Sequence, residues 1–293
     1  MPYDPTKTTA IRRSFIAQIN RRWNAIKRDI RVSIIDNDVF GIQKLKANAS
    51  LPPGSFTFYQ DPEKIAAFMQ WLLDQEAAGI LQVTGRTGRR LASNAGWTDT
   101  YIDTAYQKGI RRAYAELHRA GYETPLPIEM AFNRPVHVSR VSAAYTRTWE
   151  DLKSVVEITN SRIRRAVSET LSERIALGLA EGKNPKVIAR ELYADLAQVV
   201  DSIGINRSRL IARTEVIRAH HKATMEEYRQ AEVEGVSVQA EFLTAGDDRV
   251  CEECASLEGR VFTLAEIENL IPRHPQCRCS AIPAAKSVEV RAA

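Results

Sequence analysis

The segment that decides the fold is Asp247–Cys279, with the sequence DDRVCEECASLEGRVFTLAEIENLIPRHPQCRC. It holds all four cysteines of the 293-residue chain, arranged as the pairs Cys251-x-x-Cys254 and Cys277-x-Cys279. His274 stands three residues before the second pair. A chain that gathers every thiol into one short segment uses those thiols together, because no cysteine elsewhere is available as a partner.

A structural metal site is the first chemistry that fits this cluster. Zinc takes four tetrahedral ligands from thiolates and imidazoles, and a C-x2-C arm is a common half of such a site. The second half offers three donors for two positions. We therefore predict one zinc ion bound by Cys251, Cys254, Cys277 and either His274 or Cys279. The spacing favours His274, because H-x2-C repeats the two-residue reach of the first arm.

Two other interpretations of the cysteines stay open. Disulfides would need an oxidising environment, and the N-terminus MPYDPTKTTAIRRSF lacks the hydrophobic core of a secretory signal. Four buried free cysteines that lie together by chance would involve no cross-link at all. The segment is too small to bury a sizeable core alone, which favours a cross-link of some kind.

The hydrophobic pattern changes from helical to strand-like near Gly235. Apolar residues recur every three or four positions from Thr8 to Ile34, and similar stripes follow in several later segments. Beyond Gly235, residues 236–242 alternate between apolar and polar, which is typical of a strand with one buried face. We predict an α+β fold that is mainly α, with a helical N-terminal region and a helical hairpin followed by a small cysteine-rich α+β module.

Local signals give the boundaries of these parts. Asn184 and Pro185 suit the N-cap and first position of a helix, and Thr263 with Glu266 forms a capping box. Prolines mark residues 121–138 as a linker. The predicted organisation is a helical N-terminal domain 1–125, a linker 126–138, a helical part 139–235 that starts with a long helix to about residue 180, a cysteine-rich module 236–285 and a tail 286–293.

Positive charge is concentrated near the N-terminus. The whole chain carries a net charge of +5, and residues 1–32 alone hold eight basic and two acidic residues. A basic face of this kind can contact DNA phosphates or an acidic protein surface, or simply face solvent. The candidate contact residues are Arg12, Arg13, Arg21 and Arg22, together with Arg86, Arg89 and Arg90 in the loop TGRTGRR. That loop lacks the spacing and the lysine of a phosphate-binding P-loop.

A third motif lies on the helix predicted for residues 206–232. Arg213 and Glu215 lie off the centre of its apolar stripe, and we expect them to form a buried or half-buried pair that holds the helix against the cysteine module. His221 falls on the stripe, where a hydrogen-bonded core histidine is the expected role. His220 is expected to face solvent.

Three sequence blocks together resemble a known family. They are Ala212-Arg213-Thr214-Glu215, then Asp248-Arg249-Val250-Cys251-x-x-Cys254 with Leu257-x-Gly259, then His274-Pro275-x-Cys277-Arg278-Cys279. In order and spacing they are similar to the phage Mu F-like head morphogenesis proteins, the minor head or minor capsid proteins of tailed phages. The resemblance covers about Ser139 to Pro283. The chain has Phe242-Leu243 where the family pattern suggests a tryptophan, which affects a packing detail.

The resemblance implies a structural role in head morphogenesis, near the portal or inside the capsid. The implied partners are the portal protein, the major capsid protein, or both, with non-specific contact to double-stranded DNA. The implied location is the virion, after assembly in the host cytoplasm. No small-molecule substrate is expected, and no membrane either, because no apolar run approaches the ~20 residues of a membrane span.

The sequence argues against an enzyme. Four clustered thiols make a poor nucleophilic site, because a metal or a disulfide would consume them. A zinc hydrolase would need an open ligand position and a carboxylate base, for which Asp247, Asp248 and Glu253 are the nearest candidates. A zinc-stabilised nucleic-acid-binding module and, behind it, a metal-dependent hydrolase remain the alternatives to a head protein.

Overall fold

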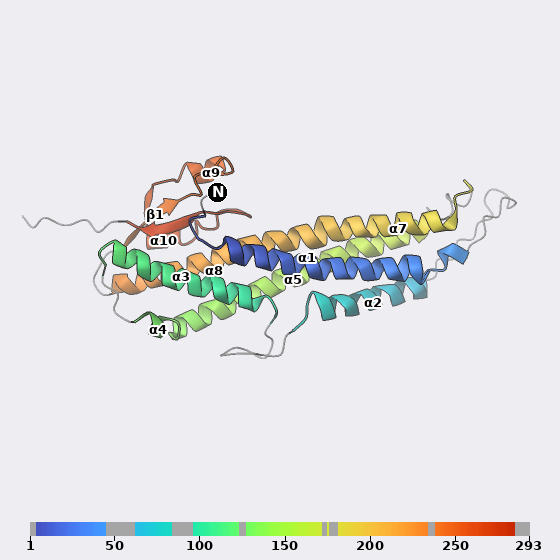
Figure 1. The fold of residues 1–293 in the computed structure, drawn as a ribbon, viewed down its shortest axis with the longest axis horizontal. Helices are drawn as coiled ribbons and strands as arrows, with labels where there is room; N and C mark the ends of the chain where they lie inside the picture. The colour runs from blue at the N-terminus through green and yellow to red at the C-terminus, as the bar shows by residue number, and fades with distance from the viewer. Residues whose placement is uncertain are drawn as a thin grey trace, which may run out of the picture. The chain divides into compact units, whose positions relative to one another are not determined.

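The computed structural model describes residues 4–44, 62–83, 96–122, 127–171, 175, 181–233 and 238–284 (Figure 1). Most of these residues are helical, and one small antiparallel sheet lies near the C-terminus. The prediction of a mainly α, α+β fold is confirmed. Within the described ranges, none of the helices combines the length and the apolar character that crossing a membrane requires.

Two compact units make up the chain, and each gathers segments that are distant in sequence. The first unit consists of Met1–Ile16, Thr84–Trp149 and Leu210–Ala293, and the second of Ala17–Val83 and Glu150–Arg209. The helices α1 (Thr9–Arg31), α5 (Pro135–Glu169) and α8 (Asn206–Val233) each contribute residues to both units.

This division does not coincide with the consecutive segments predicted from the sequence. Hydrophobic periodicity identifies a helix, but it does not show which helices pack together. The predicted linker 126–138 contains the short helix α4 (Ile128–Ala131) and the first residues of α5. The predicted tail 286–293 lies outside the described residues.

The second unit is mostly helical in its described residues. Besides parts of α1, α5 and α8, it contains η1 (Val32–Asp36), η2 (Ile42–Lys44), α2 (Pro62–Gly79), α7 (Pro185–Val199) and η4 (Val200–Ile205). The side chain of Asn184 accepts a hydrogen bond from the backbone N–H of Lys186, with Pro185 at the first helical position of α7. The predicted cap of this helix is therefore confirmed.

Helix α1 buries its apolar stripe in this unit. Ile19, Trp23, Ile26 and Ile30 are at most 3% exposed, as the periodicity predicts. Trp23 Nε1 donates to Ser208 Oγ over 3.0 Å. The indole packs so closely on Gly204 that a Cβ at that position would meet ring carbons at 2.9 Å. A glycine is thus required there by packing.

The first unit combines helices with the sheet. Its further elements are α3 (Asp99–Arg119), β1 (Gln239–Leu243), α9 (Glu252–Ala255), β2 (Val261–Thr263), α10 (Leu264–Ile267) and β3 (Ser280–Pro283). The strand order is β2-β1-β3, and both pairs are antiparallel, with Ala240 of β1 opposite Phe262 and Pro283. Thr263 and Glu266 form the predicted capping box at the start of α10.

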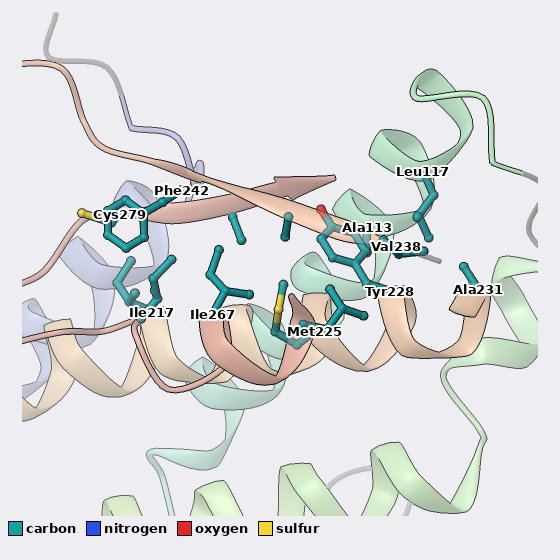
Figure 2. Packing of buried hydrophobic residues seen from close by; sticks show 14 of the residues in the cluster. Ala113, Leu117, Ile217, Met225, Tyr228, Ala231, Val238, Phe242, Ile267 and Cys279 are labelled. Atoms are coloured by element: carbon teal, nitrogen blue, oxygen red, sulfur yellow. The ribbon is translucent and has the colours of Figure 1, made fainter. Parts of the chain in front are cut away.

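One hydrophobic core joins α3, α8 and the cysteine-rich segment (Figure 2). Leu117 of α3, Ile217 and Tyr228 of α8, and Phe242 of β1 all belong to it, and so do the three buried cysteines. Burying one such aliphatic or aromatic side chain contributes roughly 1.5–3 kcal/mol. The module therefore shares its core with the helices and does not depend on a core of its own.

The histidine pair on α8 shows how closely α3 and α8 approach. A Cβ at Gly109 of α3 would lie 2.3 Å from the carbonyl oxygen of His220. His220 is only 1% exposed, so the prediction that it faces solvent is wrong, because α3 covers that side of α8. His221 is buried as predicted, with Nε2 3.2 Å from the carbonyl oxygen of Ile267.

A buried carboxyl group lies between α2 and α5 in the second unit. Glu76 is 1% exposed, and Asn160 Nδ2 donates to its Oε2 over 2.6 Å. Burial raises the pKa of Glu76 from 4.5 to about 8, and the hydrogen bond from Asn160 offsets only part of that rise. Glu76 is therefore mostly protonated at neutral pH.

This raised pKa makes stability depend on pH. Between the unfolded pKa of 4.5 and the folded pKa of about 8, the unfolded state loses the Glu76 proton while the folded state keeps it. The free energy of unfolding should therefore fall as pH rises through this window and level off above it. Glu76→Gln cannot ionise, so the variant should gain on the order of a few kcal/mol over wild type at pH 8 and little at pH 4.

Urea unfolding at several pH values measures this difference, with Glu63→Gln on the exposed side of the same helix as the matched control. Parallel stability profiles for wild type and Glu76→Gln would show that Glu76 is ionised in the folded protein at neutral pH.

Candidate functional site

Two chain segments bring the cysteines together in the first unit. The first arm follows β1, with Cys251 at the N-cap of α9 and Cys254 inside that short helix. The second arm precedes β3, where Cys277 N–H donates to the carbonyl oxygen of His274 over 3.1 Å and closes a tight turn. Gln276 inside this turn has φ +68°. The turn puts His274 and Cys277 at its two ends.

His274 lies between the sulfurs of the first arm. Its Nε2 is 3.3 Å from Cys251 Sγ and 3.3 Å from Cys254 Sγ. Its Nδ1 is 2.8 Å from the carbonyl oxygen of Pro275, which can only accept. A neutral His274 therefore carries its proton on Nδ1, and the Nε2 lone pair faces the two sulfurs.

A second donor group overlaps with the first. Cys254, Cys277 and Cys279 have sulfurs within 4.8 Å of one another, and so do the donor atoms of Cys251, Cys254 and His274. Cys254 belongs to both groups. The structure thus brings together all five predicted ligands from the two arms. Burial also differs, because Cys251 is exposed and the other three cysteines are buried.

The thiols have different proton affinities. A hydrogen bond from Cys279 lowers the pKa of Cys277 to about 5. Burial raises the pKa of Cys254 to about 12. The hydrogen bond with Cys277 raises the pKa of Cys279. Cys277 is thus the thiol of these three that loses its proton most readily, and a nearby cation would favour its thiolate further.

The carboxylates near the cluster are engaged with arginines. Asp247 accepts two hydrogen bonds from Arg278, of 2.6 and 2.5 Å, and a third from Arg249. Glu253 accepts from Arg273 over 3.2 Å. Asp248, named with the motif in the sequence, is exposed. The nearby carboxylates considered as a hydrolytic base thus include two that are paired with cations.

Asp247 and Arg278 connect the two arms, and the sequence did not single them out for this role. Asp247 precedes the first cysteine pair and Arg278 lies between the two cysteines of the second, and their bidentate contact holds the first arm against the second. The Arg278 hydrogen bonds hold the pKa of Asp247 well below its usual range. The opposite charges of the aspartate in D-x3-C and the arginine in C-R-C were the signal that could have revealed the pair.

Charged side chains fix the module on the helices. Glu268, just after α10, contacts Arg140 of α5 and both Lys222 and Arg229 of α8. Arg229 also contacts Glu226 on its own helix. One carboxylate of the module thus meets cations from two helices, which determines where the module lies on α8.

The expected pair between Arg213 and Glu215 is wrong. Glu215 is buried and pairs with Arg147 of α5 and with Arg218, while Arg213 donates to Gln276 in the turn of the second arm. Residues two apart on a helix point in different directions, so these two side chains reach different partners. Arg213 still holds α8 to the cysteine module as expected, though through an amide. Thr214 between them is half-buried.

The N-terminal arginines divide into engaged and exposed residues. Arg12 pairs with Asp4 over 2.8 Å in the first unit, and Arg22 donates to the carbonyl oxygen of Gly79 in the second. Arg13 and Arg21 are exposed. The other predicted contact residues, Arg86, Arg89 and Arg90, lie outside the described residues.

Removing the Asp247 carboxylate should loosen the cysteine arms. Asp247→Asn loses the charge that accepts from Arg278, so we expect faster amide exchange and lower protease resistance in residues 246–280, with the helices unaffected. Hydrogen exchange read by mass spectrometry measures this, and Asp248→Asn on the exposed neighbour is the control. Equal exchange in both variants would mean that the pair does not hold the arms.

Comparison with known proteins adds an independent finding. Residues 169–282 match the family model described as phage Mu protein F like protein. This range begins at the last residue of α5, contains α7 and α8, and ends within β3, so it includes both cysteine arms. No curated protein and no solved structure matches the chain. The family match confirms the resemblance seen in the sequence: residues 169–282 are a phage Mu F-like region.

Proposed function

We propose that this protein is a structural minor head protein of a tailed phage that acts in head morphogenesis. The observation that carries the proposal is the family match over residues 169–282. The matched region contains the cysteine module together with α8, the helix that shares its core. The matched region is therefore a packed structural element, and this supports a function in assembly.

The proposed site of action is the inside of the capsid or the neighbourhood of the portal, with the portal protein, the major capsid protein, or both as partners. The proposed location is the virion, after assembly in the host cytoplasm. A non-enzymatic role is supported by the paired state of Asp247 and Glu253, since a base must be free to take a proton.

Co-assembly tests the proposed partners. The full chain should co-purify with heads when it is produced together with the portal and major capsid proteins, and it should be detected by mass spectrometry in mature virions. Heads assembled without the portal separate the two partners, because a portal-bound protein should then be lost from them. A chain absent from both heads and virions would contradict the proposal, and DNA retention in that case would favour the nucleic-acid-binding alternative.

Contact with packaged DNA is the second part of the proposal. Arg13 and Arg21 are exposed and can reach phosphates, whereas Arg12 and Arg22 have partners within the protein. Phosphate contacts release counterions, so affinity should fall steeply with salt, with a slope of about −0.9 per contact on a log–log plot. Replacing Arg13 and Arg21 with glutamine should flatten that slope by about two contacts' worth.

The matched control is the pair Arg12→Gln and Arg22→Gln, which removes the same charge from engaged side chains. Fluorescence anisotropy with a random-sequence duplex over a range of salt concentrations gives both slopes. Equal slopes for wild type and the Arg13/Arg21 variant would assign these arginines to a protein partner or to solvent.

A further inference from the structure

We propose that Cys251, Cys254, His274 and Cys277 bind one Zn²⁺ ion, and that Cys279 lies outside the coordination sphere. The five donors of the two arms exceed the four that tetrahedral zinc takes. One of the five donors must therefore stay off the metal.

The distances around His274 fit a shared tetrahedral ion. Zinc lies about 2.3 Å from sulfur and about 2.0 Å from imidazole nitrogen, which places a ligand sulfur and nitrogen roughly 3.5 Å apart. His274 Nε2 is 3.3 Å from the sulfurs of both Cys251 and Cys254. Nε2 and the two sulfurs can therefore occupy three corners of a tetrahedron around one ion.

The outer contact of the imidazole supports the same assignment. His274 Nδ1 donates to the Pro275 carbonyl oxygen over 2.8 Å, and zinc-bound histidines generally donate their other ring N–H to a carbonyl or carboxylate. This bond fixes the ring plane and directs Nε2 toward the sulfurs. A surface histidine without a ligand role would gain little from such an orientation.

The fourth corner is assigned to Cys277 by the turn that contains it. Its backbone N–H donates to the carbonyl oxygen of His274, so the two ligands of the second arm are joined by a closed turn. The first arm has a similar design, in which Ala255 N–H donates to the carbonyl oxygen of Cys251 over 2.9 Å. The first turn closes one residue past Cys254 and the second closes at Cys277, and each arm supplies two ligands at the same two-residue spacing.

Cys279 is continuous with the sheet and belongs to the hydrophobic core. It directly precedes β3, which begins at Ser280. Figure 2 shows its side chain at the same end of the core as Phe242. Its sulfur lies within 4.8 Å of those of Cys254 and Cys277, close enough to act as an outer-sphere thiol on both. The pairing of β3 with β1 restricts the position of Cys279. Cys277 lies in the preceding turn, where its side chain can adjust to a metal ion.

The ion would connect the segment after β1 to the segment before β3. The ion pair between Asp247 and Arg278 connects the same two segments. Zinc and the ion pair would therefore hold the arms together at two points. Because the core of the module is shared with α3 and α8, loss of zinc should free the arms without unfolding the helices.

The wild-type test needs no variant. Full-length protein purified without added metal should contain about one zinc per chain by elemental analysis, and X-ray absorption at the zinc edge should give three sulfurs and one nitrogen. After chelation all four thiols should be titratable, three of them freed from the metal. Four sulfurs around the metal would overturn the role of His274. A protein that contains no metal and takes up none, whether its thiols are free or paired, would overturn the site.

Matched serine variants test the ligand set. In the cobalt-substituted protein, Cys277→Ser should weaken the sulfur-to-metal charge-transfer absorption, as expected when one of three sulfur ligands is lost. Cys279→Ser should keep the three-sulfur spectrum and one metal per chain, with an affinity weakened by about 10- to 100-fold, as expected for an outer-sphere residue. The reverse pattern would make Cys279 the ligand. Far-ultraviolet circular dichroism shows whether each variant keeps its helices, so that a folding failure is not read as ligand loss.

Discussion

The burial of α8 against both α3 and the sheet is the constraint on which the rest of the first unit depends. Gly109 allows the two helices to approach until the backbone of α8 meets α3 directly, and a side chain at that position would have no space. Tyr228 and Ile217 then reach from α8 into the core shared with Phe242. The sheet is too small to be stable alone, since three short strands need a packed face.

Hydrophobic packing does not by itself choose one position for the module on α8. The charged groups supply that choice, because Glu268 can meet Arg140, Lys222 and Arg229 together in only one placement. A second carboxylate, Glu227, is 2% exposed and contacts Arg134 and His137 over 3.0 and 2.6 Å. Buried pairs of this kind add little net stability, but removing one partner leaves a costly unpaired charge.

The packing of the sheet on α8 also determines where the cysteine arms lie. The first arm leaves the central strand β1, and the second enters the edge strand β3, which pairs with β1. Pairing of β1 with β3 therefore brings the two arms to the same end of the sheet, where Asp247 and Arg278 meet. A metal ion here would hold together two loops that strand pairing already places side by side. The fold would not depend on the metal to form.

The sequence by itself determined the fold class, the capped starts of α7 and α10, the buried stripe of α1 and the gathering of five metal-type donors in one segment. These features depend on local spacing, and local spacing is what a single sequence contains. The family resemblance was also readable, because its motifs are short and ordered along the chain.

Only the tertiary structure decided which groups face one another. His220 was expected in solvent and is buried because α3 covers it, and Glu215 pairs with Arg147, a residue 68 positions away. The two interleaved units likewise arise from contacts between distant segments. Partners of this kind depend on how separate helices pack, and the periodicity of one helix carries no information about the residues on another.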